Sequence, residues 1–205
     1  PAILTVSIAY QRLLKEHGIF PQAALGLSLG EYSALVASEA LPFSEAVALV
    51  AKRGAYMTEA APTGSGKMVA VMNAPIEVIE ECCEKAQELG IVSPANYNTP
   101  QQIVIGGEAQ AVDQAVALLQ EQGIKRMIPL NVSGPFHTAI LAPASEKLAT
   151  ELKNVAFNEP KIPVISNTTT EVMTKERIPI LLEQQVMKPV RFYDCLLYTS
   201  PSPRD

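Results

Sequence analysis

A glycine-flanked serine is the residue of this sequence best suited to covalent chemistry. The segment Gly26-Leu27-Ser28-Leu29-Gly30 has the form Gly-x-Ser-x-Gly. In that form the serine stands on a tight turn between a strand and a helix, and the glycines allow close packing on both sides of it. The turn lifts Ser28 Oγ clear of the backbone and leaves the Leu29 N–H at a helix N-terminus, where it can stabilise an oxyanion. The pattern alone leaves two interpretations open: a catalytic nucleophile, or a glycine-rich turn with an incidental serine.

A serine hydroxyl needs a general base near neutral pH, and the sequence contains two histidines. His17 ends the polar segment Lys15-Glu16-His17, where we expect it to bond the last carbonyls of a helix. His137 closes the loop 133–137, which is rich in Gly and Pro, and loops on a rigid scaffold commonly carry catalytic groups. We therefore expect His137 to be the base for Ser28, with a merely solvated loop histidine as the alternative.

Three further polar residues are candidates for lining a site, and each has a structural alternative. Arg53 lies among apolar residues in an expected helix, so its side chain either reaches solvent or pairs as a fork with a substrate carboxylate. Asn96 and Asn98 stand just before Thr99-Pro100, where such residues usually form a turn. The second interpretation is that the two amides line a cleft between two parts of the chain.

Apolar periodicity predicts the elements that hold these residues. We expect helices over residues 3–14, 31–40, 44–61, 76–89, 109–122, 140–152 and 174–187, and strands over 22–26, 68–72, 91–97, 103–105, 126–130 and 162–166. The strand at 22–26 leads directly into Ser28, which is the setting of a nucleophile elbow. Between residues 68 and 130 the order is strand, helix, strand, strand, helix, strand, which is the ferredoxin-like order. The fold class is therefore α/β, with a small inserted subdomain.

Composition and charge argue against several other classes of protein. The 205 residues are 48% apolar and 18% charged, with a net charge of −5 and no basic stripe, so a nucleic-acid partner is not expected. No apolar run is long enough to span a membrane. With only two histidines and no Cys-x-x-Cys pair we expect no metal site, and the three cysteines, two of them adjacent, indicate the reducing cytoplasm. The segment Gly64-Ser65-Gly66-Lys67 departs twice from the P-loop pattern, which excludes nucleoside triphosphate binding.

The segment Gly26–Leu35 resembles the active-site segment of the malonyl-CoA:acyl carrier protein transacylases, acyltransferases of fatty acid and polyketide synthesis. Further segments resemble that family in order and spacing: Lys52–Gly54, Ser93–Asn98, Gln102–Gly107, Val132–His137, Asn158–Pro160, Ser166-Asn167 and Pro189–Phe192. The resemblance extends from the start of the chain to about Asp194 and is more specific than any single motif.

The resemblance implies transfer of a malonyl group from malonyl-CoA to the phosphopantetheine thiol of acyl carrier protein, in fatty acid biosynthesis. Ser28 would carry the malonyl group, His137 would be its base, and the Leu29 N–H would bind the oxyanion. Arg53 would pair with the free malonyl carboxylate, which could not be buried cheaply without a partner, and Phe136 would narrow the pocket toward malonyl. The enzyme would need no cofactor and would be a cytoplasmic monomer with no membrane or nucleic-acid partner.

The family's fold implies an α/β-hydrolase-like core with an inserted ferredoxin-like (βαββαβ) subdomain. We expect the core at residues 1–63 and 132–195, the subdomain at 64–131, and a non-native tail at 196–205. The family usually has His where this chain has Leu27. A Gly-Gln-Gly segment that completes the oxyanion hole, and a Gly-Pro-Gly segment whose neighbourhood orients the catalytic histidine, have no match. We therefore expect a fragment that lacks both ends of the family's sequence, and whose own activity is in doubt.

Two other functions remain open at this point. A serine esterase or thioesterase of the α/β-hydrolase type would carry its acid between serine and histidine in the chain. The only aspartate there is Asp113, in an amphipathic helix of the inserted part. An inactive carrier-binding remnant is the third interpretation, and it would leave Ser28 unacylated.

Overall fold

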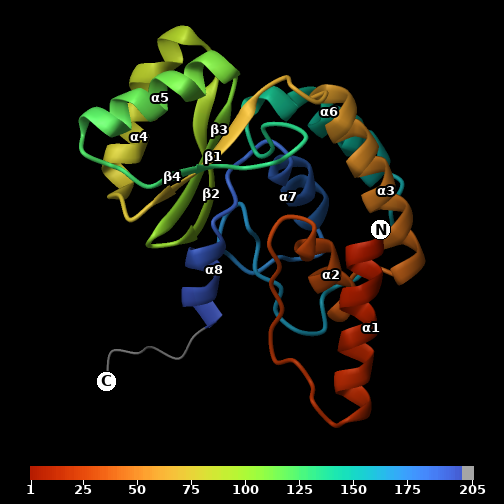
Figure 1. The fold of residues 1–205 in the computed structure, drawn as a ribbon. Helices are drawn as coiled ribbons and strands as arrows, with labels where there is room; N and C mark the ends of the chain where they lie inside the picture. The colour runs from red at the N-terminus through yellow and green to blue at the C-terminus, as the bar shows by residue number, and fades with distance from the viewer. Residues whose placement is uncertain (200–205) are drawn as a thin grey trace, which may run out of the picture.

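The computed structural model of the chain describes residues 1–199 (Figure 1). Its α-helices are α1 (Ala2–Glu16), α2 (Gly30–Ala37), α3 (Phe43–Ala60), α4 (Ile76–Ala86), α5 (Ala109–Glu121), α6 (Ala142–Leu152), α7 (Ile178–Gln185) and α8 (Phe192–Thr199). Short 3₁₀ helices occupy Gln87–Leu89 and Ala139–Leu141. The strands are β1 (Lys67–Met72), β2 (Val92–Thr99), β3 (Gln102–Gly107) and β4 (Met127–Pro129). The α/β class expected from the sequence is confirmed.

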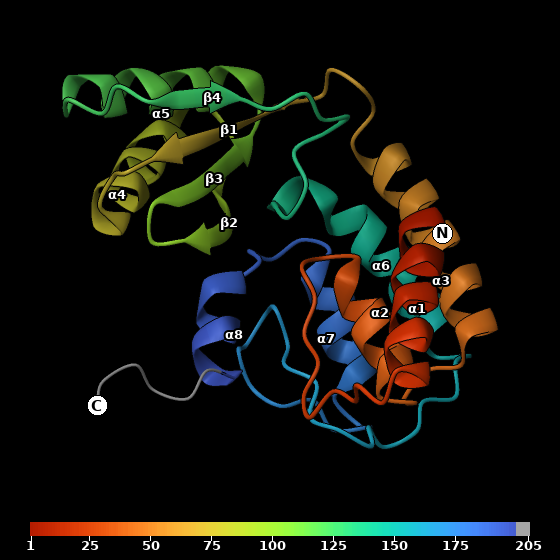
Figure 2. The same cartoon turned by 60° about the horizontal axis from the view of Figure 1, so that its bottom comes forward.

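The four strands form one antiparallel sheet in the order β2-β3-β1-β4. α4 and α5 cover one face of this sheet (Figures 1 and 2). Because side chains alternate between the faces of a strand, Val69, Val71, Ile103 and Ile105 all point into a single apolar cluster with these helices. The predicted order of strands and helices between residues 68 and 130 is confirmed.

The opposite face of the sheet is also apolar, and it faces the remaining helices. Met68, Ala70, Ala95 and Val104 form a second cluster there, with Phe136 packed against it. Burial on both faces explains why β1 reads as a continuous apolar run instead of an alternating one. The candidate site lies on this side of the sheet.

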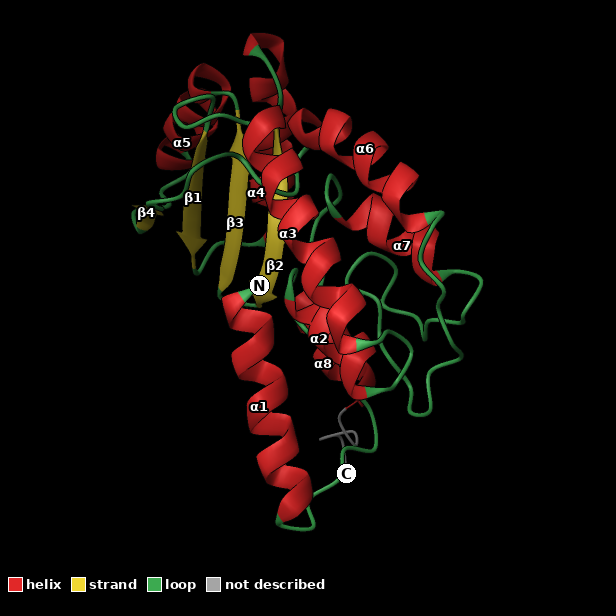
Figure 3. Ribbon diagram, turned by 90° about the vertical axis from the view of Figure 1, so that its right-hand side faces the viewer, coloured by secondary structure: helices red, strands yellow, loops and turns green. Residues whose placement is uncertain are grey.

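The largest apolar cluster holds the helices of the rest of the chain together. Tyr32, Leu35, Leu49, Leu148 and Leu182, from α2, α3, α6 and α7, are all at most 3% exposed within it. α1 packs on α2 at the outside of this group (Figure 3). No helix within residues 1–199 has both the length and the apolar composition that a membrane crossing needs.

Two predicted strands are reduced to isolated bridges, one at Ala24 and two at the adjacent residues Val164 and Ile165. Ala24 pairs in parallel with Val164, through Ala24 N–H to Pro163 O (2.8 Å) and Ile165 N–H to Ala24 O (3.0 Å). The prediction of full strands over 22–26 and 162–166 is therefore wrong. In the described part of the chain, no further strand lies beside Ala24 to extend this parallel pair into a sheet. The pair still brings the segment before Ser28 beside the segment that ends at Asn167.

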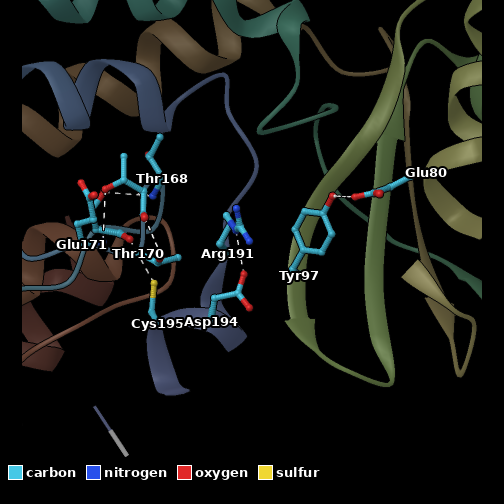
Figure 4. Close-up of polar contacts among 10 residues, drawn as sticks. Glu80, Tyr97, Thr168, Thr170, Glu171, Arg191, Asp194 and Cys195 are labelled. Atoms are coloured by element: carbon cyan, nitrogen blue, oxygen red, sulfur yellow. Dashed lines mark hydrogen bonds and ion pairs between the residues drawn. The ribbon is translucent and has the colours of Figure 1, made fainter. Parts of the chain in front are cut away.

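A short backbone pairing joins the small sheet to the helical part. Tyr97 N–H donates to Val190 O (2.8 Å) and Val190 N–H donates to Ala95 O (2.9 Å), so Val190 extends the sheet at its β2 edge. Beyond this pairing Tyr97 bonds Glu80, and Arg191 bonds Asp194 (Figure 4). These two backbone bonds to Val190 fix Asn96, which lies between Ala95 and Tyr97, relative to the helices.

Two predicted boundaries near the C-terminus need correction. The helix expected over 174–187 begins at Ile178, because the N–H groups of Arg177 and Ile178 close a turn on Thr174 O first. The predicted tail, 196–205, is not irregular from its start, since α8 continues to Thr199. Residues 200–205 lie outside the described part of the chain, and the non-native origin of the tail stays a prediction.

Candidate active site

The serine turn has the backbone of a nucleophile elbow. Ser28 adopts a left-handed conformation with φ of 53°, which is unusual for a residue with a side chain, and α2 begins two residues later. A Cβ on Gly26 would lie 2.1 Å from the carbonyl carbon of Gly30, whereas a Cβ on Gly30 would meet nothing within 4 Å. Close packing therefore requires glycine before the serine but not after it, which corrects the expectation for Gly30.

Gly26→Ala should destabilise the protein by about 3 kcal/mol or more, because the new methyl group overlaps the backbone of Gly30, which cannot rotate away. Gly30→Ala, in the same motif, should stay within about 0.5 kcal/mol of the wild type. Urea unfolding of both variants measures the two free energies. Equal midpoints for the two variants would contradict the packing argument.

His137 meets Ser28 across 109 positions of the sequence. Its Nε2 lies 2.8 Å from Ser28 Oγ, and its side chain is buried, with the residue 4% exposed. The ring's other nitrogen, Nδ1, lies 2.8 Å from the backbone oxygen of Gln185. That carbonyl can only accept, so Nδ1 carries the proton and Nε2 is free to accept the proton of Ser28. The expectation that the histidine's orienting partner is missing from the chain is wrong, because Gln185 supplies it.

Burial sets the protonation of His137. Desolvation in the interior, followed by the positive charge of Arg53, lowers the pKa of the imidazole from 6.5 to about 4. Near neutral pH the ring is therefore neutral, which is the form that can take a proton. A solvated loop histidine, the alternative left open by the sequence, is excluded by the burial.

Arg53 points into the same place from α3. It shares the buried face of Leu49, Val50 and Met57, so its position in the helix turns the side chain inward, and the residue is 5% exposed. Its Nη2 donates to Ser28 Oγ at 2.9 Å and to Gln185 Oε1 at 3.1 Å. Its buried Nε has no acceptor within residues 1–199. A guanidinium that reaches solvent is therefore excluded.

Beneath the serine lie three buried polar residues that the sequence analysis did not select: Glu31, Asn167 and Gln185. Gln185 Nε2 donates to Ser28 O at 2.9 Å and to Glu31 Oε2. The other carboxyl oxygen, Glu31 Oε1, accepts the Asn167 N–H at 2.6 Å. Complete burial raises the pKa of Glu31 to about 8 despite these bonds. Each of the three residues is tied to the turn that carries Ser28, directly or through another.

A cavity of about 490 Å³ opens over Ser28 and extends under the small sheet. Its lining includes all the predicted cleft residues, namely Asn96, Asn98 and Phe136, together with Leu27, Met68, Leu130 and Val132. Asn98 Nδ2 donates to Gln102 Oε1 at 3.0 Å, while Asn98 Oδ1 is buried with no partner in residues 1–199. The wall is largely apolar, with a few polar groups gathered near Ser28, as is usual in ligand pockets.

Two other candidates are kept away from the serine. His17 Nδ1 lies 2.8 Å from Leu13 O at the end of α1, the structural role expected for it. Asp113 is an exposed residue of α5 that bonds Lys67 Nζ with both carboxyl oxygens, at 2.6 and 2.8 Å. It cannot serve as the acid of a Ser-His-Asp triad, because His137 Nδ1 already bonds the Gln185 carbonyl.

The acyl transferase domain family matches residues 1–201 of the chain. The chain belongs to that family. Among its relatives are the malonyl CoA-acyl carrier protein transacylases of Bacillus subtilis (strain 168), 47% identical over 198 residues, and Escherichia coli (strain K12), 42% identical over 200 residues. The alignments cover 96% and 97% of this chain, which spans 62% and 65% of the length of the two relatives.

Solved structures agree with this acyl transferase domain in fold. MCAT from Streptococcus pneumoniae is 65% identical, with a TM-score of 0.94, over 96% of this chain and 64% of that one. A type II PKS acyl-carrier protein in complex with its malonyl-transacylase, PlMCAT:AntF, contains a chain that is 40% identical, with a TM-score of 0.91. That match covers 94% of this acyl transferase domain and 63% of the other chain.

In this acyl transferase domain, His137 Nε2 and Arg53 Nη2 both bond the same atom, Ser28 Oγ. The Leu29 N–H stands at the start of α2, and the structure gives it no acceptor in residues 1–199. Glu31 and Asn167 both fall inside segments that resemble the family, which was the one signal that could have found them. Gln185 lay outside every such segment, so nothing in the sequence marked it.

Proposed function

We propose that the protein transfers a malonyl group from malonyl-CoA to the phosphopantetheine thiol of an acyl carrier protein, through a malonyl ester on Ser28, in fatty acid biosynthesis. The observation that carries the proposal is the meeting of a base and a cation at one hydroxyl: Ser28 Oγ is 2.8 Å from His137 Nε2 and 2.9 Å from Arg53 Nη2. A nucleophile, its base and a cation for an anionic acyl group are the parts that such a transfer needs. The names of the relatives agree with these two substrates.

The first half-reaction makes the acyl-serine. Ser28 Oγ attacks the thioester carbonyl carbon while its proton passes to His137 Nε2, which is neutral and oriented by Gln185 O. The resulting oxyanion accepts a hydrogen bond from the Leu29 N–H at the N-terminus of α2, where the helix dipole also favours negative charge. The carbon–sulfur bond then breaks, and the sulfur takes the proton from His137, so CoA leaves as its thiol.

The second half-reaction reverses these roles for a new thiol. The phosphopantetheine thiol gives its proton to His137 Nε2, and its sulfur attacks the ester carbon. The bond between that carbon and Ser28 Oγ breaks, and Oγ recovers the proton from His137. One base therefore serves both halves, and neither half needs a redox or metal partner for its atoms and electrons to balance.

Arg53 is the residue from which we infer that the acyl group carries a free carboxylate. Arg53 lines the cavity, and within residues 1–199 its buried Nε has no acceptor, while its Nη2 donates to Ser28 Oγ and to Gln185 Oε1. A carboxylate at this position would pair with the fork and satisfy the orphaned donor. A neutral acyl group would leave the guanidinium as it is, so discrimination follows from one residue.

We also infer an architecture in which a ferredoxin-like subdomain, residues 64–131, is inserted into a discontinuous α/β-hydrolase-like core, residues 1–63 and 132–195. The separate apolar clusters of the two parts and the strand order β2-β3-β1-β4 support this division. The cavity draws residues from both parts, with Ser28 and Arg53 from one and Asn96 from the other. Movement between the parts would therefore change access to the serine.

The test is a transfer assay followed by mass spectrometry. The protein is incubated with malonyl-CoA, freed from excess substrate, and then mixed with holo acyl carrier protein. We expect a malonyl adduct on the peptide that contains Ser28, and its loss as the carrier protein gains the same mass. Release of free malonate without transfer would support a thioesterase instead, and absence of any adduct would support an inactive remnant.

A further inference from the structure

The side chain of Asn167 spans the nucleophile turn. Its Oδ1 accepts the Ser28 N–H at 2.7 Å, and its Nδ2 donates to Gly26 O at 2.7 Å. One amide thus bonds the backbone on both sides of Leu27, in the way that a neighbouring strand would. Asn167 itself is completely buried, which strengthens the hydrogen bonds that its side chain makes.

The backbone of Asn167 is held from two other directions. Its N–H donates to Glu31 Oε1 at 2.6 Å, and its carbonyl accepts the Arg191 N–H at 2.9 Å. The segment before it pairs with Ala24, so Asn167 sits at the end of the parallel neighbour of the segment that leads into Ser28. The amide is therefore placed by contacts with α2 and Arg191 and by the pairing beside Ala24, in addition to its own bonds to the turn.

We propose that Asn167 is a positioning residue, which holds Ser28 in its left-handed conformation and thereby keeps Oγ directed at His137. A residue other than glycine keeps this left-handed backbone conformation only when contacts from the surrounding structure hold it there. The hydrogen bonds from the Asn167 side chain to Gly26 O and Ser28 N–H are contacts of this kind, and they come from outside the turn. By occupying the Ser28 N–H, the amide also leaves oxyanion binding to the Leu29 N–H. The inference rests on the proposed function, because it concerns the formation of the same acyl-serine.

A purely structural role makes a different prediction. If Asn167 only fills the interior, its replacement lowers stability, and the fraction that folds acylates at the normal rate. If it positions Ser28, the folded variant acylates slowly while it still binds malonyl-CoA, because the amide lies beneath the turn and is absent from the cavity lining. The two roles therefore separate in the rate constant of acylation, measured at saturating substrate.

The experiment compares Asn167→Ala with Asn154→Ala, whose exposed amide lies just after α6 and donates to Thr150 O in the last turn of that helix. Single-turnover acylation by malonyl-CoA is followed over a range of concentrations, and urea unfolding gives the folded fraction. For Asn167→Ala we expect the maximal acylation rate to fall about 10²-fold, as for other misplaced catalytic groups. The half-saturating malonyl-CoA concentration should stay near the wild-type value, and Asn154→Ala should match the wild type throughout.

A second reagent and a second variant keep the outcome decisive. A fluorophosphonate ester, which reacts with activated serines whatever their acyl substrate, should label Ser28 of the wild type and label Asn167→Ala about 10²-fold more slowly. Asn167→Ser carries the same expectation if the alanine variant does not fold. Wild-type rates with both reagents in a folded variant would overturn the positioning role. Labelling of the wild type by the fluorophosphonate but not by malonyl-CoA would reject the proposed function alone, and the fluorophosphonate rates would still decide the role of Asn167.

Discussion

Replacing Ser28 with alanine is expected to abolish the acyl adduct and to lower malonyl transfer to the carrier thiol by about 10⁴-fold or more. Within residues 1–199 the hydroxyl is the only group that both His137 Nε2 and Arg53 Nη2 contact at hydrogen-bond distance, so its loss leaves the base without a proton to accept. Intact-protein mass after incubation with malonyl-CoA measures the adduct, and the mass of the carrier protein measures transfer.

Ser33→Ala is the matched control, because Ser33 lies on the following helix and its buried hydroxyl has no partner within residues 1–199. That variant should keep both the adduct and the transfer rate. An adduct that persists in Ser28→Ala would move the acyl group to another side chain and would remove the basis of the proposed mechanism.

The pairing of Ser28 with His137 could be predicted because the sequence offers so few alternatives. Two histidines compete for the role, and His17 stands at a helix end with a structural task of its own. The serine is flanked by glycines, and at Gly26 glycine is required because a Cβ there would overlap the backbone of Gly30. Residue types that are rare in a chain carry more positional information than common ones.

The polar residues beneath the turn could not be found in the same way. Asn, Gln and Glu are common at surfaces, and their burial at 31, 167 and 185 depends on contacts 136 and 154 positions apart in the chain. The orienting group for His137 is a backbone carbonyl, which every residue has, so no side-chain pattern can reveal it. Local spacing predicts elements and turns, whereas these contacts arise only when distant segments pack.

The small sheet was predicted more accurately than the segments beside Ser28. β1 and β3 are apolar runs that pair with each other along their whole lengths, and apolar side chains of α4 and α5 cover them. Residues 22–26 and 162–166 also contain several apolar residues, but they pair with each other only at Ala24 and Val164 in the described structure. Composition indicates that a segment is buried and extended, and the number of neighbours decides whether it is a regular strand.

The position of Arg53 links the charge of the acyl group to the strength of the base. The guanidinium donates to Ser28 Oγ, which draws electron density from the nucleophile, and its charge adds to burial in lowering the pKa of His137. A carboxylate paired with Arg53 would neutralise that charge and compete for the donor that now bonds Oγ. The imidazole would then be a stronger base and the hydroxyl a freer nucleophile, and an acetyl group could produce neither change.

Arg53→Ala should therefore lower kcat/KM for malonyl-CoA by about 10²-fold or more, the loss expected when a buried charge pair is truncated. For acetyl-CoA, kcat/KM should change by less than about 10-fold, because the neutral group never formed that pair. Lys52→Ala, the neighbouring cation, which bonds Glu151 at the surface, should leave both values unaltered. Arg53→Lys should recover only part of the malonyl activity, since an ammonium restores the charge without the planar fork. The measurement is the initial rate of acyl transfer from each thioester, and an equal loss with malonyl-CoA and acetyl-CoA would show that Arg53 supports the serine without recognising the carboxylate.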